Sequence, residues 1–300
     1  MDSPRRVGPW AAIRAPAIVA VFLLGWVAAA SALELAPWKD DLFAYPAILS
    51  EDDGGDTVVV GYDIQRDLYA RDEIPEKRAR PEYVALVPQR EVAFTVDGRR
   101  LKFIGAGKID GGASAVVIYV HGQGGSRTQG ANQWSFGGNF NRVMNLMTRN
   151  GGAFIATDFT DFGETGRDDL RALVADQAAK SPGAAIFVAC GSQGGVICWQ
   201  LAEDETAAAN LAGLLFLGSY PDEAFLRSAA MKARVPVYFG QGSNDTVFGS
   251  DGQRDLAARI RKAAPGYPVR FVLFDTGSHG TPIRMTDWRL ILNWMLAARD

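Results

Sequence analysis

The sequence predicts an α/β fold in which helices cover both faces of a mostly parallel sheet. Two observations support this prediction. From Gly111 to the C-terminus, short apolar runs alternate with longer segments of helical periodicity, and this alternation is typical of parallel strands joined by crossover helices. Within it, the apolar run at 184–189 leads through a single serine into a helical pattern, so a buried strand is expected to turn directly into a helix.

The N-terminal segment has the features of a secretory signal peptide. Arginines at positions 5, 6 and 14 precede an uncharged run over 15–33, whose end reads Ala28-Ala29-Ala30-Ser31-Ala32. An Ala-x-Ala end is typical of signal cleavage, so we predict cleavage after Ala32 and an exported protein, periplasmic or secreted. The alternative is an uncleaved membrane anchor, because the run is close to the roughly 20 residues that span a bilayer.

The remaining chain divides at about residue 80. Residues 33–80 form an N-terminal extension in which 57–62 has the composition of an edge strand. Short β-rich runs follow at 83–87, 91–95 and 101–106, where Pro88 and the turn signal Asp97-Gly98 separate them, as in an antiparallel hairpin region. We predict one globular domain over residues 81–300.

Strands and helices alternate through the rest of this domain. The predicted strands are 115–120, 153–157, 184–189, 211–217, 236–239 and 269–274. The predicted helices are 140–148, 165–178, the segment that ends at 202, 222–232, 252–263 and 287–298.

The turn between the predicted strand at 184–189 and the helix that follows it carries a chemical signature. Ser192 lies between Cys190-Gly191 and Gln193-Gly194, so the residues two positions before and after it are small enough for a sharp, strained turn. Such a turn holds the hydroxyl clear of the sheet and places the Gln193 amide at a helix N-terminus, where negative charge is stabilised. Taken alone, the pentapeptide also fits a simpler interpretation, a serine that caps a helix.

The pentapeptide resembles the Gly-x-Ser-x-Gly nucleophile elbow of the α/β-hydrolase family, with Cys190 in place of the first glycine. The order of elements, an antiparallel start followed by parallel crossovers, is also similar to that family over about residues 83–300. The resemblance implies an α/β-hydrolase fold with a mostly parallel eight-stranded sheet and helices on both faces. Only 53 positions separate Ser192 from Asp245, so no large lid is expected.

Two loops extend the resemblance. Residues 120–126, Val-His-Gly-Gln-Gly-Gly-Ser, are similar to the family's His-Gly-x-Gly turn after the first parallel strand. By that match, the backbone amides of Gln123 and Gln193 form the oxyanion hole. Residues 158–165 resemble a turn that is structural in the family.

A serine nucleophile needs a base and an acid, and the sequence offers few candidates. His121 and His279 are the two histidines of the chain. The family order of serine, acid and histidine implies that His279, just past the last predicted strand, is the base, and that His121 anchors its loop. Asp245, after the strand at 236–239, is the implied acid, and Asp222, after the preceding strand, is the main alternative.

The two cysteines are predicted to be buried free thiols. Cys190 ends a strand, and Cys198 lies six residues beyond Ser192 in the following helix. Their Cα atoms are therefore expected to be too far apart for a disulfide.

Composition argues against several other classes of function. The 300 residues carry a formal net charge of −3 without a run of basic residues, so nucleic acid is not an expected partner. With two histidines a multi-histidine metal site is hard to build, and a site made of carboxylates alone, the remaining alternative, has no clustered signature. No Gly-Lys-Ser/Thr follows the glycine-rich loop at 122–125, as a phosphate-binding loop requires. We expect no metal and no cofactor.

The sequence therefore predicts an exported serine hydrolase, similar to carboxylesterases, that cleaves a carboxylic ester through a Ser192–His279–Asp245 triad and an acyl-enzyme intermediate. The expected partner is a small-molecule or acylated substrate, and membrane association is expected only if residues 1–32 stay uncleaved. An acyltransferase or peptidase on the same triad is one alternative, and a catalytically silent binding protein of this fold is another.

Overall fold

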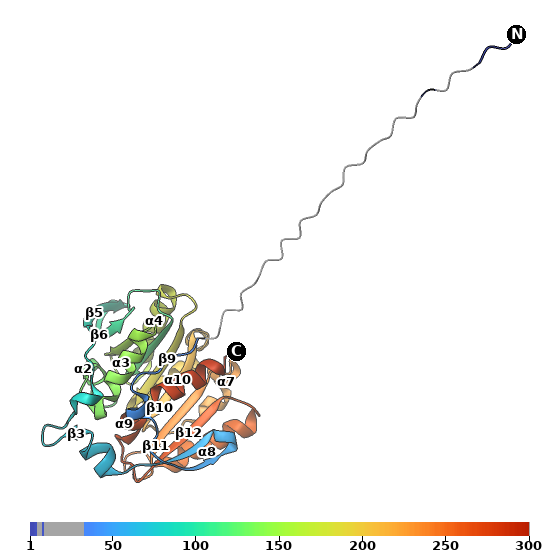
Figure 1. The fold of residues 1–300 in the computed structure, drawn as a ribbon. Helices are drawn as coiled ribbons and strands as arrows, with labels where there is room; N and C mark the ends of the chain where they lie inside the picture. The colour runs from blue at the N-terminus through green and yellow to red at the C-terminus, as the bar shows by residue number, and fades with distance from the viewer. Residues whose placement is uncertain (5–7, 9–32, 300) are drawn as a thin grey trace. The chain divides into compact units, whose positions relative to one another are not determined.

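The computed structural model describes residues 1–4, 8 and 33–299 (Figure 1). The chain separates into two units, residues 1–31 and 32–300, and all described helices and strands belong to the second. The signal peptide or anchor predicted at residues 1–32 lies, apart from positions 1–4 and 8, outside the described residues. In the part of the chain that the structure describes, no helix is both long enough and apolar enough to cross a membrane.

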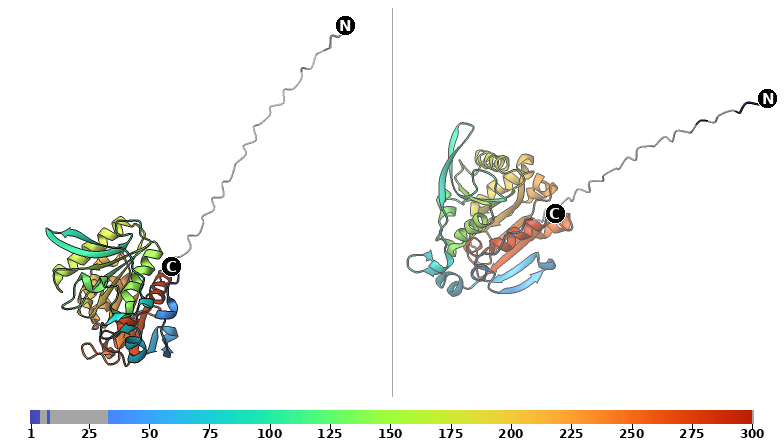
Figure 2. Two further views of the ribbon diagram at one scale, coloured as in Figure 1. Left: turned by 60° about the vertical axis from the view of Figure 1, so that its left-hand side comes forward. Right: turned by 45° about the horizontal axis from the view of Figure 1, so that its top comes forward.

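A ten-stranded sheet forms the centre of the second unit. Its strands are β1 (Ile48–Asp52), β2 (Thr57–Gly61), β5 (Gln89–Val96), β6 (Arg99–Gly107), β7 (Ala115–Val120), β8 (Ala153–Thr157), β9 (Ala185–Gly191), β10 (Leu211–Leu217), β11 (Val237–Gly242) and β12 (Val269–Asp275). Their order is β1-β2-β12-β11-β10-β9-β7-β8-β6-β5. The strands from β2 to β8 in this order are parallel, and β1, β6 and β5 pair antiparallel. Figure 2 shows the long β5–β6 hairpin at one end of the sheet and the β1–β2 pair at the other.

The central strands form where the sequence is continuously apolar. Every residue of β7, β8, β9 and β10 is buried, as expected for parallel strands covered on both faces. The bounds of β7, β8 and β10 match the predicted strands residue for residue.

Helices cover the two faces of the sheet and enclose a hydrophobic core on each (Figure 1). The helices are α1 (Asp40–Phe43), α2 (Arg127–Ala131), α3 (Asn139–Arg149), α4 (Glu164–Lys180), α5 (Gly195–Glu203), α6 (Glu205–Ala208), α7 (Ala229–Lys232), α8 (Ser250–Ala263), α9 (Thr281–Met285) and α10 (Trp288–Ala297). Apolar side chains of α3, α9 and α10 share one core, and those of α4, α5 and α8 share the other.

The predicted fold class is confirmed, but the sheet has ten strands instead of the predicted eight. Residues 48–61 add β1 and β2, which lie outside the predicted globular domain. The stretch at 57–62 is not an edge strand, because β2 pairs with β12 on one side and with β1 on the other.

Two further predicted elements differ from the structure. Tyr83–Val87 is not a strand; the backbone of Val87 bonds the side chain of Gln133 at 3.0 and 3.3 Å instead of a neighbouring strand. The helix predicted at 222–232 is broken at Ser228, which has extended backbone and caps α7 after the short 3₁₀ helix η6 (Glu223–Arg227).

The prediction of free thiols is wrong, because Cys190 and Cys198 form a disulfide. Their Cα atoms are 6.2 Å apart, within the range that a disulfide bridges. The prediction counted the distance along the helix, but α5 folds back against β9 and brings Cys198 close to Cys190. Both residues are fully buried.

We predict that the double substitution Cys190→Ala and Cys198→Ala lowers the free energy of unfolding by roughly 2–3 kcal/mol, because the crosslink no longer restricts the unfolded chain. Urea-induced unfolding of the two proteins measures this difference. The control is the intact mass of the wild type before and after reduction. Equal stabilities, or a wild type with two free thiols, would contradict the prediction.

Candidate active site

Ser192 lies in a strained turn between β9 and α5. β9 ends at Gly191, and the short helix η5 (Ser192–Gly194) leads into α5. The φ angle of Ser192 is +52°, in the left-handed region that a non-glycine residue rarely adopts. This is the sharp strand-to-helix turn that the sequence predicts at this position, and the strain is typical of a functional residue.

Close backbone packing explains two glycines near the elbow. A Cβ atom on Gly194 would lie 2.7 Å from the carbonyl oxygen of His121, and one on Gly122 would lie 2.8 Å from Ser192 Cβ. The loop after β7 and the elbow therefore contact each other directly. Cys190 replaces the glycine of the family pattern without a clash, because its side chain is buried in the core and bonded to Cys198.

His279 lies between Ser192 and Asp245 and contacts both. Its Nε2 atom is 2.8 Å from Ser192 Oγ, and its Nδ1 atom is 2.8 Å from Asp245 Oδ2. The three residues follow β9, β11 and β12, whose carboxyl ends meet at one edge of the parallel sheet. When Nδ1–H donates to the carboxylate, Nε2 of the neutral imidazole is left to accept the serine proton. The structure thus brings together the three side chains that the sequence predicts for the triad.

The carboxylate of Asp245 is buried and has several hydrogen-bond donors. The amides of Val247 and Phe248 donate to Oδ1 at 2.8 and 3.0 Å, and Gln241 Nε2 donates to Oδ2 at 3.0 Å. Its side chain has no exposed surface, so these donors satisfy it and fix its orientation. The bonds to Val247 and Phe248 form an Asx-type turn. No pattern in the sequence indicates that Gln241 supports the same carboxylate.

The alternative acid, Asp222, has a different partner. Its Oδ1 accepts from the amide of Ala224 at 2.8 Å and caps η6. Among the described residues, the carboxylate that contacts His279 is that of Asp245. The geometry therefore favours Asp245 over Asp222 for the position behind the imidazole.

The loop predicted to supply an oxyanion donor lies against Ser192. A Cβ atom on Gly122 would be 3.2 Å from Ser192 Oγ, so the next residue, Gln123, follows close to the hydroxyl. Among the described residues, no acceptor takes the Gln123 amide. Gln193 lies on the other side of the turn, within η5. His121 anchors this loop as expected, since its Nδ1 lies 2.8 Å from the carbonyl oxygen of Gly122.

The N-terminal extension stabilises α9, the helix that follows His279. Arg284 of α9 donates to Asp72 Oδ2 at 2.9 Å, and both side chains are largely buried. Arg71, next to Asp72, lies between two aromatic rings, and burial lowers the pKa of its guanidinium to about 10. Residues before position 80 therefore help to fix α9 and, through it, the position of His279.

Half-buried aromatic side chains border the three residues. The Phe248 ring lies 5.7 Å from the His279 ring, and the Tyr220 ring lies 5.7 Å from that of Phe248. On another side, a Cβ atom on Gly280 would lie 3.5 Å from the ring of Phe136. Aromatic rings therefore lie beside His279 and beside the residue that follows it.

The arrangement fits nucleophilic chemistry by a serine hydroxyl. An imidazole at hydrogen-bond distance can accept the hydroxyl proton, and the carboxylate behind it stabilises the charge that the imidazole gains. Among residues 1–4, 8 and 33–299, no group of three or more histidine, cysteine, aspartate or glutamate side chains is placed to hold a metal ion.

No protein-family model matches the sequence, and no curated protein matches it either. Several solved structures are similar to this chain. An esterase from Pyrococcus furiosus is 18% identical with a TM-score of 0.51, over 70% of this chain and 91% of that chain. An α/β serine hydrolase homologue from Coxiella burnetii is 16% identical with a TM-score of 0.51, over 70% of this chain and 97% of that chain.

A third solved structure, a putative α/β-hydrolase of unknown function from Agrobacterium tumefaciens, is 18% identical with a TM-score of 0.51, over 70% of this chain and 96% of that chain. At these identities the likenesses bear on the fold alone. Together with the mostly parallel sheet and the turn at Ser192, they show that the chain has the α/β-hydrolase fold.

Proposed function

We propose that the protein is an exported serine hydrolase that cleaves a carboxylic ester. One observation carries the proposal: two contacts of 2.8 Å join Ser192 to His279 and His279 to Asp245, with the serine in a strained elbow. Strain at a non-glycine residue persists only where the surrounding structure enforces it, and it concentrates at functional sites.

In the proposed reaction, Ser192 Oγ attacks the ester carbonyl carbon while its proton passes to His279 Nε2. Asp245 orients the imidazole and stabilises its positive charge. The tetrahedral intermediate then expels the alcohol, which takes the proton from His279 and leaves an acyl-enzyme on Ser192. Water attacks this ester with the same base, and the carboxylic acid leaves as the serine regains its proton.

The backbone amides of Gln123 and Gln193 are the proposed oxyanion donors. Three features support this: the close approach of Gly122 to Ser192, the Gln123 amide without an acceptor among the described residues, and the position of Gln193 where the helical turn begins. Donors fixed at this point act on the charge that develops in the transition state. The aromatic border formed by Phe136, Tyr220 and Phe248 favours an ester with an apolar group.

Export is the second part of the proposal. The basic, apolar and small-residue sections of positions 1–32 support a cleaved signal peptide, and the Cys190–Cys198 disulfide fits an oxidising compartment. Cleavage after Ala32 would keep Leu35 in the mature protein. This residue is part of the folded structure, because its side chain is fully buried and its amide donates to Asn293 Oδ1 at 2.8 Å. If the segment stays uncleaved, it anchors the enzyme to a membrane.

Ser192→Ala is expected to lower the hydrolysis of p-nitrophenyl butyrate by at least about 10³-fold, because it removes the nucleophile. A fluorophosphonate probe should label the wild type at Ser192 and leave the variant unlabelled, as peptide mapping by mass spectrometry would show. Circular dichroism is the control for folding. A folded wild type without an adduct would contradict the proposal and favour a silent binding protein.

Asp245→Asn is expected to lower kcat by about 10³- to 10⁴-fold, because the amide no longer holds the imidazole in the required tautomer. Asp222→Asn is the matched control, since Asp222 caps η6 and does not contact His279. Steady-state kinetics of both variants measure the effect. A larger loss for Asp222→Asn than for Asp245→Asn would assign the acid to Asp222.

The full chain, expressed in a bacterial host with a working export pathway, is expected to yield a mature protein that begins at Leu33. The small residues at positions 30 and 32 are what signal cleavage requires. N-terminal sequencing and intact mass check this. Ala32→Arg is the control that should block cleavage, and a full-length wild type recovered with the membranes would instead establish the anchor.

A further inference from the structure

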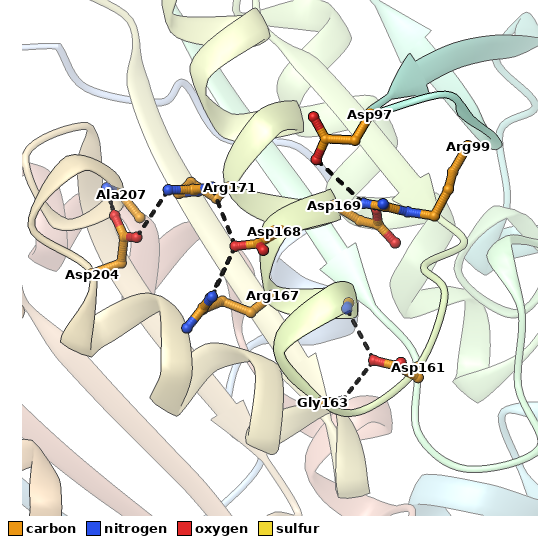
Figure 3. Close-up of polar contacts among 11 residues, drawn as sticks. Asp97, Arg99, Asp161, Gly163, Arg167, Asp168, Asp169, Arg171, Asp204 and Ala207 are labelled. Carbon is orange, nitrogen blue, oxygen red and sulfur yellow. Dashed lines mark hydrogen bonds and ion pairs between the residues drawn. The ribbon is translucent and has the colours of Figure 1, made fainter.

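A fully buried carboxylate on α4 lies outside the proposed triad. Asp169 has no exposed surface. Its Oδ2 accepts from the amide and the hydroxyl of Thr160 at 2.8 and 2.6 Å, and its Oδ1 accepts from Arg99 Nη2 at 2.9 Å. Figure 3 shows Asp169 beside Arg99, while Asp168 points the other way, toward Arg167 and Arg171. Asp169 therefore ties α4 to β6 and to the loop that follows β8.

That loop contacts both ends of the segment predicted to hold the oxyanion. Just before Thr160, the ring of Phe159 stacks on the ring of His121, with centroids 4.5 Å apart and an interplanar angle of 24°. One residue earlier, Asp158 Oδ1 accepts from the amide of Arg127 at 2.7 Å, where α2 begins. Asp158, Phe159 and Thr160 are consecutive, so their positions depend on one another.

His121 connects the loop after β8 to the residues beside Ser192. Its Nδ1 lies 2.8 Å from the carbonyl oxygen of Gly122, and a Cβ atom on Gly122 would lie 3.2 Å from Ser192 Oγ. Gln123 is the next residue. A shift of His121 would therefore displace the Gln123 amide relative to Ser192.

The far end of the loop after β8 is fixed separately. Asp161 Oδ1 accepts from the amides of Gly163 and Gly166 at 2.8 and 3.0 Å (Figure 3), and these bonds hold the pKa of the Asp161 carboxyl below its usual value. Asp161 thereby secures the start of α4 without Asp169. Loss of the Asp169 bonds should release Thr160 and Phe159 while α4 stays formed.

We propose that Asp169 is a positioning residue for the oxyanion loop. It holds Thr160, which sets Phe159 against His121, and His121 in turn sets the amide of Gln123. The inference rests on the proposed function. Because an oxyanion donor acts mainly in the transition state, its displacement lowers kcat and leaves KM nearly unchanged.

The test compares four variants of the protein: Asp169→Asn, Thr160→Val, Thr160→Ser and Asp168→Asn. Thr160→Val removes the hydroxyl donor and keeps the amide, whereas Thr160→Ser keeps both donors. Asp168→Asn is the matched control, because this neighbour is 28% exposed and pairs with Arg167 and Arg171. Hydrolysis of p-nitrophenyl butyrate gives kcat and KM, and hydrogen exchange followed by mass spectrometry reports on the amides of 121–126.

We expect Asp169→Asn to lower kcat by about 10- to 100-fold, since a displacement of about 1 Å can cost that much, with faster exchange at 121–126. Thr160→Val should also lower kcat and speed exchange at 121–126, but by smaller factors than Asp169→Asn. Thr160→Ser and Asp168→Asn should match the wild type in both. The proposal is overturned if exchange at 121–126 is unaltered in both Asp169→Asn and Thr160→Val. It is also overturned if stability falls while kcat per folded molecule stays constant.

The two proposals fail in distinguishable ways. If the wild type hydrolyses no ester and takes no fluorophosphonate, the proposed function fails. The exchange data then still decide whether Asp169 holds the loop at 121–126: faster exchange in Asp169→Asn but not in Asp168→Asn supports the link, and equal exchange overturns it.

Discussion

The site depends on one constraint, the left-handed backbone of Ser192, which the elements around it must enforce. A strained residue keeps its conformation only when the elements on both sides of it cannot move. Here β9 is buried between β7 and β10, and α5 is joined to it by the Cys190–Cys198 disulfide. Glycines at 122 and 194 let the neighbouring backbone close around the turn. Rigid support from β9 and α5 therefore fixes the orientation of the Ser192 hydroxyl.

The parallel sheet then supplies the partners of this hydroxyl. Because β9, β11 and β12 all end at the same edge, loops far apart in sequence meet there. Within its own loop, Asp245 is held by the amides of Val247 and Phe248. Two other segments are supported from outside the site: the one after His279 by the N-terminal extension through Asp72, and the loop after β7 by α4 through Thr160. The site consists of a few residues, but their positions depend on most of the fold.

The sequence was sufficient for the elements whose environment is uniform. Continuous apolar runs were enough to predict the bounds of β7, β8 and β10. The resemblance to α/β-hydrolases was enough to predict that Ser192, Asp245 and His279 lie together, with Asp222 as the alternative acid, and their roles remain predictions. β1 could not be found, because all five of its residues are exposed and no alternation marks it. The disulfide and the hydrogen bonds of Asp169 depend on how closely a helix approaches the neighbouring strand or loop. Local sequence does not encode the distance between such elements.

The pairing of β2 with β12 has a consequence for how the molecule is made. Thr57 of β2 lies opposite Phe271 of β12, which is made 214 residues later. Contacts this distant in sequence form slowly, because a long loop must close before they stabilise anything. During synthesis, β2 has no partner besides β1 in the described sheet until β12 has been made. The β1–β2 pair therefore joins the central sheet late, after the strands that lie between β2 and β12 in the sequence have been made.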